Sequence, residues 1–350
     1  MLNSKVKKIL LFGGTFDPVH LGHVKLCKEA ISKVKPDLTI IMTNKNPPLK
    51  TFDAIATTHD RIEMLKIAFK NIKNLIVSDY EARNESEEKS YTWKTIKWLK
   101  RQYPKASIYL LIGYDRLVVF KDWANYQYIL DNVTLVAGIR NKNEKITNDF
   151  NGIKISYKPI EAVSKQLRES IDPKFLDSNV LKYIRKHHLY LEGQIRPYMN
   201  QHRYDHTLRV RATALEIAIS NGYEALNKVV VAAMYHDICK QCDEKEILKI
   251  CAHADKSHYP TWHTLHGLAA SIVAEEKLGL KDREVLNAIK NHCVPAKQMD
   301  TLSKIIYLAD KLEPARTKED IPNRKKYLNL ACRKMDEAFK KLHKITQEKY

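Results

Sequence analysis

The first half of the chain alternates short apolar runs with segments whose apolar residues recur at helical spacing. Apolar runs of this length, bounded by glycine or other turn residues, are typical of buried strands. They lie at residues 9–12, 38–42, 75–77, 108–112 and 133–137. Helical spacing marks residues 20–30 and 58–71, and Ser90-Tyr91-Thr92 is predicted to cap a helix that continues to Lys100. Strands alternating with helices predict an α/β domain whose parallel sheet is covered on both faces.

The pattern changes near residue 192. Residues 180–190 are predicted to form the last helix of a first domain, and Glu192-Gly193-Gln194 forms a short boundary. Beyond this boundary the strand signals disappear and helical windows follow one another. The windows are 203–221, 225–240, 244–253, 264–278, 282–293, 300–313 and 321–345. We therefore predict an α/β domain over residues 1–192 and an all-α domain over residues 193–350.

The composition fits two globular domains. Of the 350 residues, 44% are hydrophobic and 29% are charged. No apolar run approaches the ~18 residues of a membrane span, and the run after the basic N-terminus is too short for a signal peptide. Six cysteines are scattered without a framework spacing, which predicts reduced thiols and a cytoplasmic protein.

The formal net charge of +19 leaves two interpretations open, a nucleic-acid-binding surface and a lysine-rich solvated surface. The second is favoured because the lysines are spread along the whole chain and form no RNA-binding motif or arginine-rich tail. A basic surface still attracts anionic nucleotides. We expect small-molecule nucleotides as partners, and neither nucleic acid nor a membrane; an oligomer remains possible.

The first chemical signal lies where the first strand gives way to a helix. Gly13 and Gly14 end the strand, and His20 and His23 stand at the start of the helix. Glycines let backbone N–H groups approach an anion, and the helix N-terminus favours negative charge, so this segment predicts a phosphate cradle. A β-hairpin turn with surface histidines is the structural alternative. Ligands of parallel sheets bind at the carboxyl ends of the strands.

This segment resembles the signature of the HxGH nucleotidyltransferases, with His20-Leu21-Gly22-His23 as the tetrad. Other motifs follow the order seen in the bacterial nicotinate-nucleotide adenylyltransferases, and the resemblance covers about residues 5–191. These motifs are the Asn46-Pro47-Pro48-Leu49-Lys50 loop, Asp60-Arg61-Ile62-Glu63-Met64-Leu65, Ser90-Tyr91-Thr92, Ile112-Gly113-Tyr114-Asp115 and Trp123. The resemblance implies a Rossmann-like nucleotidyltransferase domain.

The resemblance implies adenylyl transfer in NAD biosynthesis. The phosphate of nicotinate mononucleotide would attack the α-phosphorus of ATP, giving deamido-NAD and pyrophosphate. His20, His23, Lys50 and Arg168 would stabilise the charge together with Mg²⁺ that arrives with ATP. The implied substrate contacts are Gly13, Gly14, Thr15, Phe16, Thr92, Gly113, Asp115, Trp123 and Ser164. Taken without the family, Trp123 is more often a core aromatic.

The second ATP motif of the family is matched by Ser164-Lys165-Gln166-Leu167-Arg168. Arg168 would hold the tail phosphates of ATP in a bidentate manner. The segment departs from the family pattern because Lys165 and Val163 stand where serine or threonine is usual. One hydroxyl contact is therefore missing, although a lysine also reaches a phosphate.

The second half is marked by polar residues at the ends of apolar helices. The set is His206, His236, Asp237, His266, His292 and Asp310. His236-Asp237 follows a strongly apolar run, and burial of these groups without partners would cost several kcal/mol. Imidazoles and carboxylates from different helices suit Fe²⁺, Mn²⁺ or Zn²⁺. Six such ligands predict two metal ions, with Asp237 as the best candidate for a shared carboxylate.

Two alternatives concern this metal site. His263 lies three residues before His266 and on the same helical face, and we prefer His266. A rival zinc site would use Cys239, Cys242, Cys251 and His253, whose spacing is zinc-like. The other histidines are expected to cap or pack helices singly.

Residues 195–345 resemble the HD-domain phosphohydrolases, and among them the bacterial HD-type symmetrical diadenosine tetraphosphate hydrolases. The matching motifs are Arg203-Tyr204-Asp205-His206, His236-Asp237-Ile238-Cys239-Lys240, Leu265-His266-Gly267, Ala288-Ile289-Lys290-Asn291-His292 and the segment from Tyr307 to Arg316. The resemblance implies cleavage of diadenosine tetraphosphate to two ADP, with two iron ions or with manganese, zinc or cobalt. Arg203, Lys240 and Arg316 would contact the substrate.

Together the two resemblances imply a bifunctional enzyme. Two alternatives remain at this point. The first domain could be a pantetheine-phosphate adenylyltransferase, which shares the Gly14-Thr15-Phe16-Asp17-Pro18 opening. The whole chain could instead be a nucleotide-sensing or RNA-binding protein with a degenerate HD domain.

Overall fold

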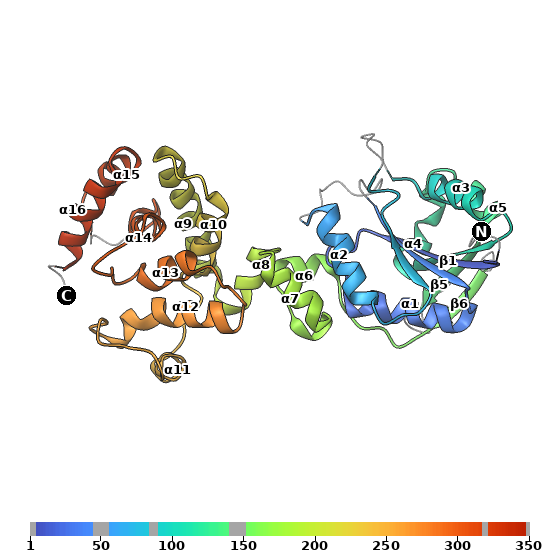
Figure 1. Cartoon of the computed structure of the whole chain (residues 1–350), viewed down its shortest axis with the longest axis horizontal. Coiled ribbons are helices and arrows are strands. Elements are labelled where there is room, and N and C mark those ends of the chain that lie inside the picture. The colour runs from blue at the N-terminus through green and yellow to red at the C-terminus, as the bar shows by residue number, and fades with distance from the viewer. Residues whose placement is uncertain (1–4, 45–55, 84–89, 140–151, 317–320, 348–350) are drawn as a thin grey trace. The chain divides into compact units, whose positions relative to one another are not determined.

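The computed structural model describes residues 5–44, 56–83, 90–139, 152–316 and 321–347 (Figure 1). Contacts divide the chain into two compact units. The first contains residues 1–168 and 172–183, and the second contains residues 169–171 and 184–350. The division at residues 183 and 184 lies nine residues before the predicted boundary, which stays a prediction.

The first unit is built on a six-stranded sheet in the order β3-β2-β1-β4-β5-β6. All neighbouring pairs are parallel, which confirms the predicted α/β class. The strands are β1 (Lys8–Gly14), β2 (Leu38–Thr43), β3 (Leu75–Ser78), β4 (Ser107–Gly113), β5 (Thr134–Ile139) and β6 (Gly152–Ser156). β1 is central, and its residues 9–12 are buried because helices cover both faces of the sheet.

The helices of this unit follow the predicted order. They are α1 (Leu21–Val34), α2 (Thr58–Phe69), α3 (Thr92–Gln102), α4 (Tyr114–Val118), α5 (Tyr126–Asn132), α6 (Ser164–Glu169) and α7 (Ser178–Lys186). The N-cap of α3 is Tyr91, which lies within the predicted Ser90-Tyr91-Thr92 segment, but no side-chain hydrogen bond caps the helix. Strand β6 was not predicted because it is short and half-exposed.

The second unit is all-α, as predicted (Figure 1). Its helices are α8 (Leu191–Ile195), α9 (Gln201–Ser220), α10 (Leu226–Tyr235), α11 (Glu244–Ile250), α12 (His266–Glu276), α13 (Arg283–Asn291), α14 (Thr301–Leu312), α15 (Arg324–Arg333) and α16 (Met335–Gln347). Two predicted windows differ. The window 225–240 stops being helical at Tyr235, and the window 321–345 is two helices separated at Lys334.

The core of this unit forms where α9, α10, α13 and α14 pack together. Val229 and residues 231–234 of α10 are almost completely buried, so the polar residues that follow this helix also start in the interior. Among the described residues, no helix is long and apolar enough to cross a membrane.

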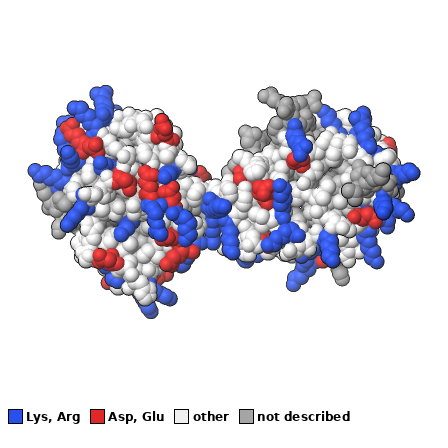
Figure 2. All heavy atoms as spheres, viewed as in Figure 1, with Lys and Arg blue, Asp and Glu red and all other residues white. Residues whose placement is uncertain are grey.

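Lysine and arginine are scattered over the visible faces of both units, with acidic side chains among them (Figure 2). This distribution agrees with the solvated surface that we favoured from the sequence. All six cysteines are free thiols.

Candidate functional site

Each unit contains one candidate site, and the first is built at the carboxyl end of β1. Gly13 and Gly14 end the strand, and a side chain at Gly14 would place its Cβ 2.9 Å from the Phe16 ring. Glycine therefore lets Phe16 fold closely over the strand end. Phe16 itself is buried with φ of 50°, an uncommon conformation for a bulky residue. Thr15 is also buried, so the turn is rigidly packed beneath the start of α1.

His20 and His23 lie together at the N-terminus of α1. Their rings stack with centroids 3.6 Å apart, and Phe16 packs edge-on against His23 at 5.0 Å. The backbone N–H of His20 donates to Nδ1 of His23 over 3.2 Å. Nδ1 of His23 is therefore an acceptor, and in the neutral ring the proton resides on Nε2, where it can be donated to a phosphate.

Ser164 and Arg168 of α6 contact the turn that joins β1 to α1. Ser164 Oγ donates to the carbonyl of Pro18 over 2.9 Å, and Arg168 Nη1 donates to the carbonyl of Asp17 over 2.6 Å. Arg168 also lies 3.7 Å from the Asp17 carboxylate, which is fully buried. The structure thus brings the second predicted ATP motif to the predicted cradle, although the two are separated by about 150 residues in sequence. Lys165 is exposed.

The remaining predicted residues of this unit lie at other positions. β4 pairs with β1, so Gly113 and the exposed Asp115 lie at the same edge of the sheet as Gly14. Thr92 begins α3, and Trp123 packs against Phe120. Among the described residues, neither Thr92 nor Trp123 shares a hydrogen bond, ion pair or ring contact with the cradle. Lys50 lies outside the described residues.

Nε1 of Trp123 is buried and has no hydrogen-bond partner in the described part of the chain. Buried indole N–H groups usually find a partner. This donor is therefore open to an acceptor on a ligand.

Arg61 lies in a motif that matches the family, but the sequence analysis gave it no role at this site. Its side chain is 1% exposed, and its Nη1 donates to the carbonyls of Thr15 and Asn44 and to Oγ1 of Thr43 over 2.8–3.0 Å. The guanidinium thus ties the cradle turn to the end of β2. Charged residues on helices are normally exposed, and the available signal was its position beside Ile62 on the apolar face of α2.

The second candidate site gathers the six predicted polar residues in the all-α unit, all of them buried. α9 carries His206, and α14 carries Asp310. His236 and Asp237 follow the last residue of α10, His266 begins α12, and His292 caps α13. The apolar helices of the core therefore deliver polar side chains to one place at their ends.

These residues form two groups of possible metal ligands that share Asp237. Oδ2 of Asp237 lies 3.7 Å from Nε2 of His206 and 3.4 Å from Nε2 of His236, and Oδ1 of Asp310 lies 3.2 Å from Nε2 of His206. Oδ1 of Asp237 lies 3.3 Å from Nε2 of His266 and 3.4 Å from Nε2 of His292. Two ligand atoms that each lie about 2.1 Å from one ion can be at most about 4.2 Å apart. The spacing therefore fits a metal ion in each group.

All four imidazoles present the same nitrogen to these groups. Nδ1 of His236, His266 and His292 donates in each case to the carbonyl three residues earlier, over 2.7 Å. This hydrogen bond leaves Nε2 unprotonated in the neutral ring, with its lone pair directed at the cluster. Nε2 of His236 is buried and has no hydrogen-bond partner in the described part of the chain. A cation would satisfy it.

Glu313 provides the corresponding contact for His206, and the sequence analysis missed it. Nδ1 of His206 donates to Oε1 of Glu313 over 3.1 Å, and Arg209 donates to the other carboxylate oxygen over 2.9 Å. Burial acts to raise the pKa of Glu313, but hydrogen bonds from His206 and Arg209 lower it to about 2. The available signal was that Glu313 follows Asp310 by three residues and so shares its helical face.

Cationic side chains surround the two carboxylates. Arg203 donates to Oδ2 of Asp237 over 2.8 Å. Lys311 lies 3.0 Å from Oδ2 of Asp310, and Arg316 donates to Oδ1 of the same carboxylate. Burial acts to raise the pKa of Asp310, but Lys311 and Arg316 hold it well below its usual range. Both carboxylates are therefore ionised at neutral pH, as metal ligands must be.

The two alternatives for this site find no support in the geometry. His263 is exposed, and it is His266 whose ring enters the second group. The described residues Cys239, Cys242, Cys251 and His253 do not form a group of ligand atoms close enough to hold one ion. Cys239 instead follows the histidine–aspartate pair.

Comparisons with known proteins match both halves of the chain. A family model described as cytidylyltransferase-like matches residues 11–171, and a model described as HD domain matches residues 203–315. A Mycoplasma genitalium protein named "Probable nicotinate-nucleotide adenylyltransferase/Ap4A hydrolase" is 36% identical over 317 residues, which cover 89% of each chain. A Borrelia garinii protein named "Probable nicotinate-nucleotide adenylyltransferase" is 32% identical over 190 residues, 53% of this chain and 95% of that protein.

Among solved structures, an HD superfamily hydrolase from Clostridium acetobutylicum, described as involved in NAD metabolism, is 31% identical. The match covers 41% of this chain and 75% of that one, with a TM-score of 0.38.

Proposed function

We propose that this chain is a bifunctional nucleotide enzyme. The chain belongs to the family of nicotinate-nucleotide adenylyltransferase/Ap4A hydrolases, in which a cytidylyltransferase-like domain is followed by an HD domain. The first unit transfers AMP from ATP to nicotinate mononucleotide. The second unit hydrolyses diadenosine tetraphosphate symmetrically. The scattered free cysteines support a cytoplasmic location for both reactions.

In the first reaction, a phosphate oxygen of nicotinate mononucleotide attacks the α-phosphorus of ATP. The bond between the α-phosphorus and its bridging oxygen to the β-phosphate breaks, pyrophosphate leaves, and deamido-NAD forms. No residue becomes covalently attached, so catalysis consists of positioning and charge stabilisation. The N-terminus of α1, the imidazole of His20, the Nε2 proton of His23, and Arg168 supply the positive potential. Lys50 is proposed to add a further cation, and Mg²⁺ accompanies ATP.

The other substrate contacts in this unit come from the edge of the sheet. Gly13, Gly14, Thr15 and Phe16 shape the phosphate cradle, and Gly113 and Asp115 lie beside it. Thr92 and Trp123 are proposed to border the pyridine nucleotide. Support for Trp123 comes from its buried indole N–H, which has no partner among the described residues.

In the second unit, His206, His236, Asp237 and Asp310 would hold one divalent ion, and Asp237, His266 and His292 a second. The chemistry that two such ions would supply, when bound, is a lower pKa of a water molecule and neutralisation of charge on the leaving phosphate. Iron is our first choice of metal, with manganese, zinc or cobalt as alternatives. Asp237 would be a ligand of both ions, because each of its oxygens faces a different group of imidazoles.

The cations around the cluster would bind the polyphosphate. Arg203 and Arg316 reach the two carboxylates, and Nε of Arg316 is buried with no hydrogen-bond partner among the described residues. Lys240 lies beside His266. Arginine matches the geometry of phosphate oxygens especially well.

The observation that carries the hydrolase proposal is the sharing of Asp237 between two groups of buried imidazoles. The test is chromatography of products after incubation of the metal-loaded full chain with diadenosine tetraphosphate. We expect ADP alone. ATP plus AMP, or no cleavage at any metal tested, would contradict the proposal.

The matched variant is Asp237→Ala. We expect it to lose almost all hydrolysis and part of the bound metal, because two ions lose their shared ligand. Adenylyl transfer in the same preparation, measured with ATP and nicotinate mononucleotide, serves as the control for folding and should stay unchanged. Hydrolysis by this variant at the wild-type rate would contradict the assignment of Asp237 as a metal ligand. Phosphopantetheine as the preferred acceptor would favour the alternative assignment of the first unit.

A further inference from the structure

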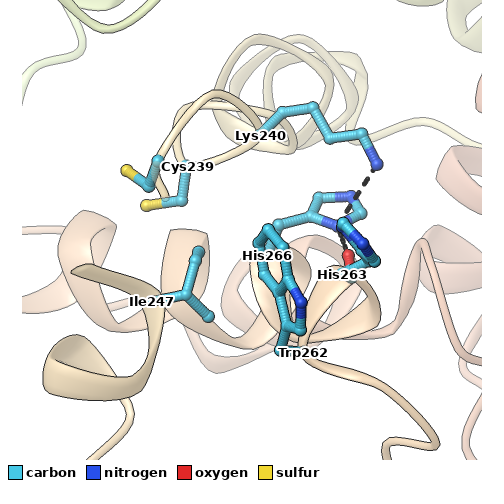
Figure 3. Close-up of a pocket in the computed structure, with 7 residues that line it drawn as sticks. Cys239, Lys240, Ile247, Trp262, His263 and His266 are labelled. Atoms are coloured by element: carbon cyan, nitrogen blue, oxygen red, sulfur yellow. Dashed lines mark hydrogen bonds between the residues drawn. The ribbon is translucent and has the colours of Figure 1, made fainter. Parts of the chain in front are cut away.

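A small pocket opens next to His266 in the second unit (Figure 3). Its apolar wall consists of Cys239, Cys242, Ile247 and Trp262, and Lys240 stands at its polar end. Three separate segments supply this lining: the turn after α10, helix α11, and the 3-10 helix Trp262–Leu265. The metal cluster uses only His266 from this set, so the remaining lining has no role in holding the ions.

Trp262 is the aromatic surface of the pocket. Its side chain is half-buried, and the indole packs on the ring of His263 with centroids 3.7 Å apart and an angle of 31°. A capping pair between Thr261 and Thr264 fixes the short helix, with Thr264 Oγ1 donating to the carbonyl of Thr261 over 2.6 Å. The indole is thus held in place at the pocket while part of it stays accessible.

The polar end of the pocket leads toward the metal cluster. Nζ of Lys240 lies 3.5 Å from Nδ1 of His266, and Lys240 forms no ion pair with a carboxylate among the described residues (Figure 3). The opposite nitrogen of the same ring, Nε2, lies 3.3 Å from Asp237. One imidazole ring therefore separates the pocket from the second ligand group. A ligand with a flat apolar ring and an attached anionic chain would match the apolar wall, the Lys240 ammonium and the metal-ligand group, in that order.

We propose that this pocket binds an adenine base of the substrate, stacked on the indole of Trp262, while Lys240 contacts the phosphate chain that runs to the cluster. The proposal rests on the hydrolysis of diadenosine tetraphosphate proposed above. Stacking of a base on an aromatic side chain strengthens binding by about tenfold or more. The sulfur atoms of Cys239 and Cys242 suit the opposite wall, because sulfur packs favourably against aromatic rings.

The test compares Trp262→Leu, which keeps an apolar side chain but removes the stacking surface, with Trp262→Phe, which keeps an aromatic ring. For diadenosine tetraphosphate we expect Trp262→Leu to raise KM about tenfold, as loss of this stacking implies, with kcat nearly unchanged. Trp262→Phe should stay close to wild type. Inorganic tetraphosphate, used as a competitive inhibitor without a base, should inhibit all three proteins with the same constant.

An unchanged KM in Trp262→Leu, or an equal loss of affinity for inorganic tetraphosphate, would overturn the base-binding assignment. Failure of the proposed hydrolysis is a separate outcome, seen as a wild-type chain that does not cleave diadenosine tetraphosphate. Binding is then measured with ADP as a change in tryptophan fluorescence. Trp93, Trp98 and Trp123 belong to the first unit, so the difference between wild type and Trp262→Phe reports the pocket. No difference would overturn the proposal.

Discussion

The orientation of each ligand histidine depends on a single hydrogen bond at Nδ1. For His236, His266 and His292 the acceptor is a backbone carbonyl three residues earlier, which side-chain substitutions cannot remove. For His206 the acceptor is the side chain of Glu313, which comes from 107 residues away in sequence. Outer-shell partners of this kind fix both the tautomer and the direction of the ligand nitrogen.

Glu313→Ala should therefore weaken metal binding and hydrolysis by about 10- to 100-fold. Glu313→Gln should lose less, because its amide oxygen still accepts the proton of Nδ1. Metal retention during titration with a chelator measures the effect, with Glu276→Ala, an exposed carboxylate of α12, as the control. Equal metal affinity in Glu313→Ala and wild type would show that His206 needs no such partner.

His23→Ala is predicted to lower adenylyl transfer about 100-fold or more, in the range found when a transition-state donor is removed. The reason is that Nδ1 of His23 accepts a backbone hydrogen bond, which directs the opposite nitrogen outward as a donor. Hydrolysis of diadenosine tetraphosphate by the same protein should be unchanged. His59→Ala, an exposed histidine of α2, is the matched control for adenylyl transfer. Full transfer activity in His23→Ala would exclude this role.

At the scale of elements, the helices of the second unit begin with side-chain caps. Asn200, Asp243, Asp282 and Asp300 each accept a hydrogen bond from a backbone N–H in the first turn of their helix. Three of these helices carry or precede a ligand of the metal cluster. Their starting points therefore help to set where His206, His292 and Asp310 are placed.

Asp282→Ala should reduce the free energy of unfolding by about 1 kcal/mol at neutral pH, the typical contribution of such a cap. Burial raises the pKa of Asp282, but hydrogen bonds from Lys228 and from the backbone of α13 outweigh it, so the pKa falls below its ordinary 3.8. A carboxylate whose pKa is lower in the folded state stabilises the folded protein at pH values above its pKa in the unfolded chain. This stabilisation is lost as the pH falls through the pKa of the folded state.

The difference in stability between wild type and Asp282→Ala should therefore be constant above about pH 5 and shrink below pH 3.8. Urea unfolding of the full chain, followed by circular dichroism, measures it. Asp282→Asn keeps the cap without the charge and should show little of this pH dependence. A difference that grows on acidification would contradict the assignment.

The sequence predicted the elements whose apolar pattern is complete. Strands β1, β2 and β4 are buried on both faces, so their runs are uninterrupted and easily recognised. β6 is partly exposed, so its sequence pattern resembles that of a loop. The end of α10 at Tyr235 depends on the turn that places His236 in the interior. Local pattern carries no information about such tertiary requirements.

The candidate sites divide in a similar way. Residues within a local motif, such as His20 and the His236–Asp237 pair, were recognisable from spacing. Arg61 and Glu313 also lie in matching segments, but their roles were not recognisable, because these roles depend on carbonyl or imidazole partners that only the fold brings near. A single charged residue on a helix has the same local pattern whether it faces solvent or an active site.

At the scale of the whole molecule, the two units are predicted to work separately. Fragments 1–192 and 194–350 should retain adenylyl transfer and hydrolysis, respectively. The second fragment loses Glu192, which accepts hydrogen bonds from Tyr204 and Arg211. Exposed pairs of this kind contribute little, so its activity should survive with slightly lower stability. Comparison with a fragment starting at Ile184, where the contact division falls, tests this boundary. If neither pair of fragments folds, the units depend on each other.

Both proposed active sites belong to one polypeptide, so the two kinds of site are always present in equal numbers. Every copy that is translated adds one site that forms a dinucleotide and one that cleaves a polyphosphate. Gene dosage and transcription therefore change both capacities by the same factor and cannot set their ratio. A cell that carries this chain must adjust the balance at the sites themselves, through the supply of their substrates. Scarcity of the divalent metal of the HD domain would lower polyphosphate cleavage and leave dinucleotide synthesis running.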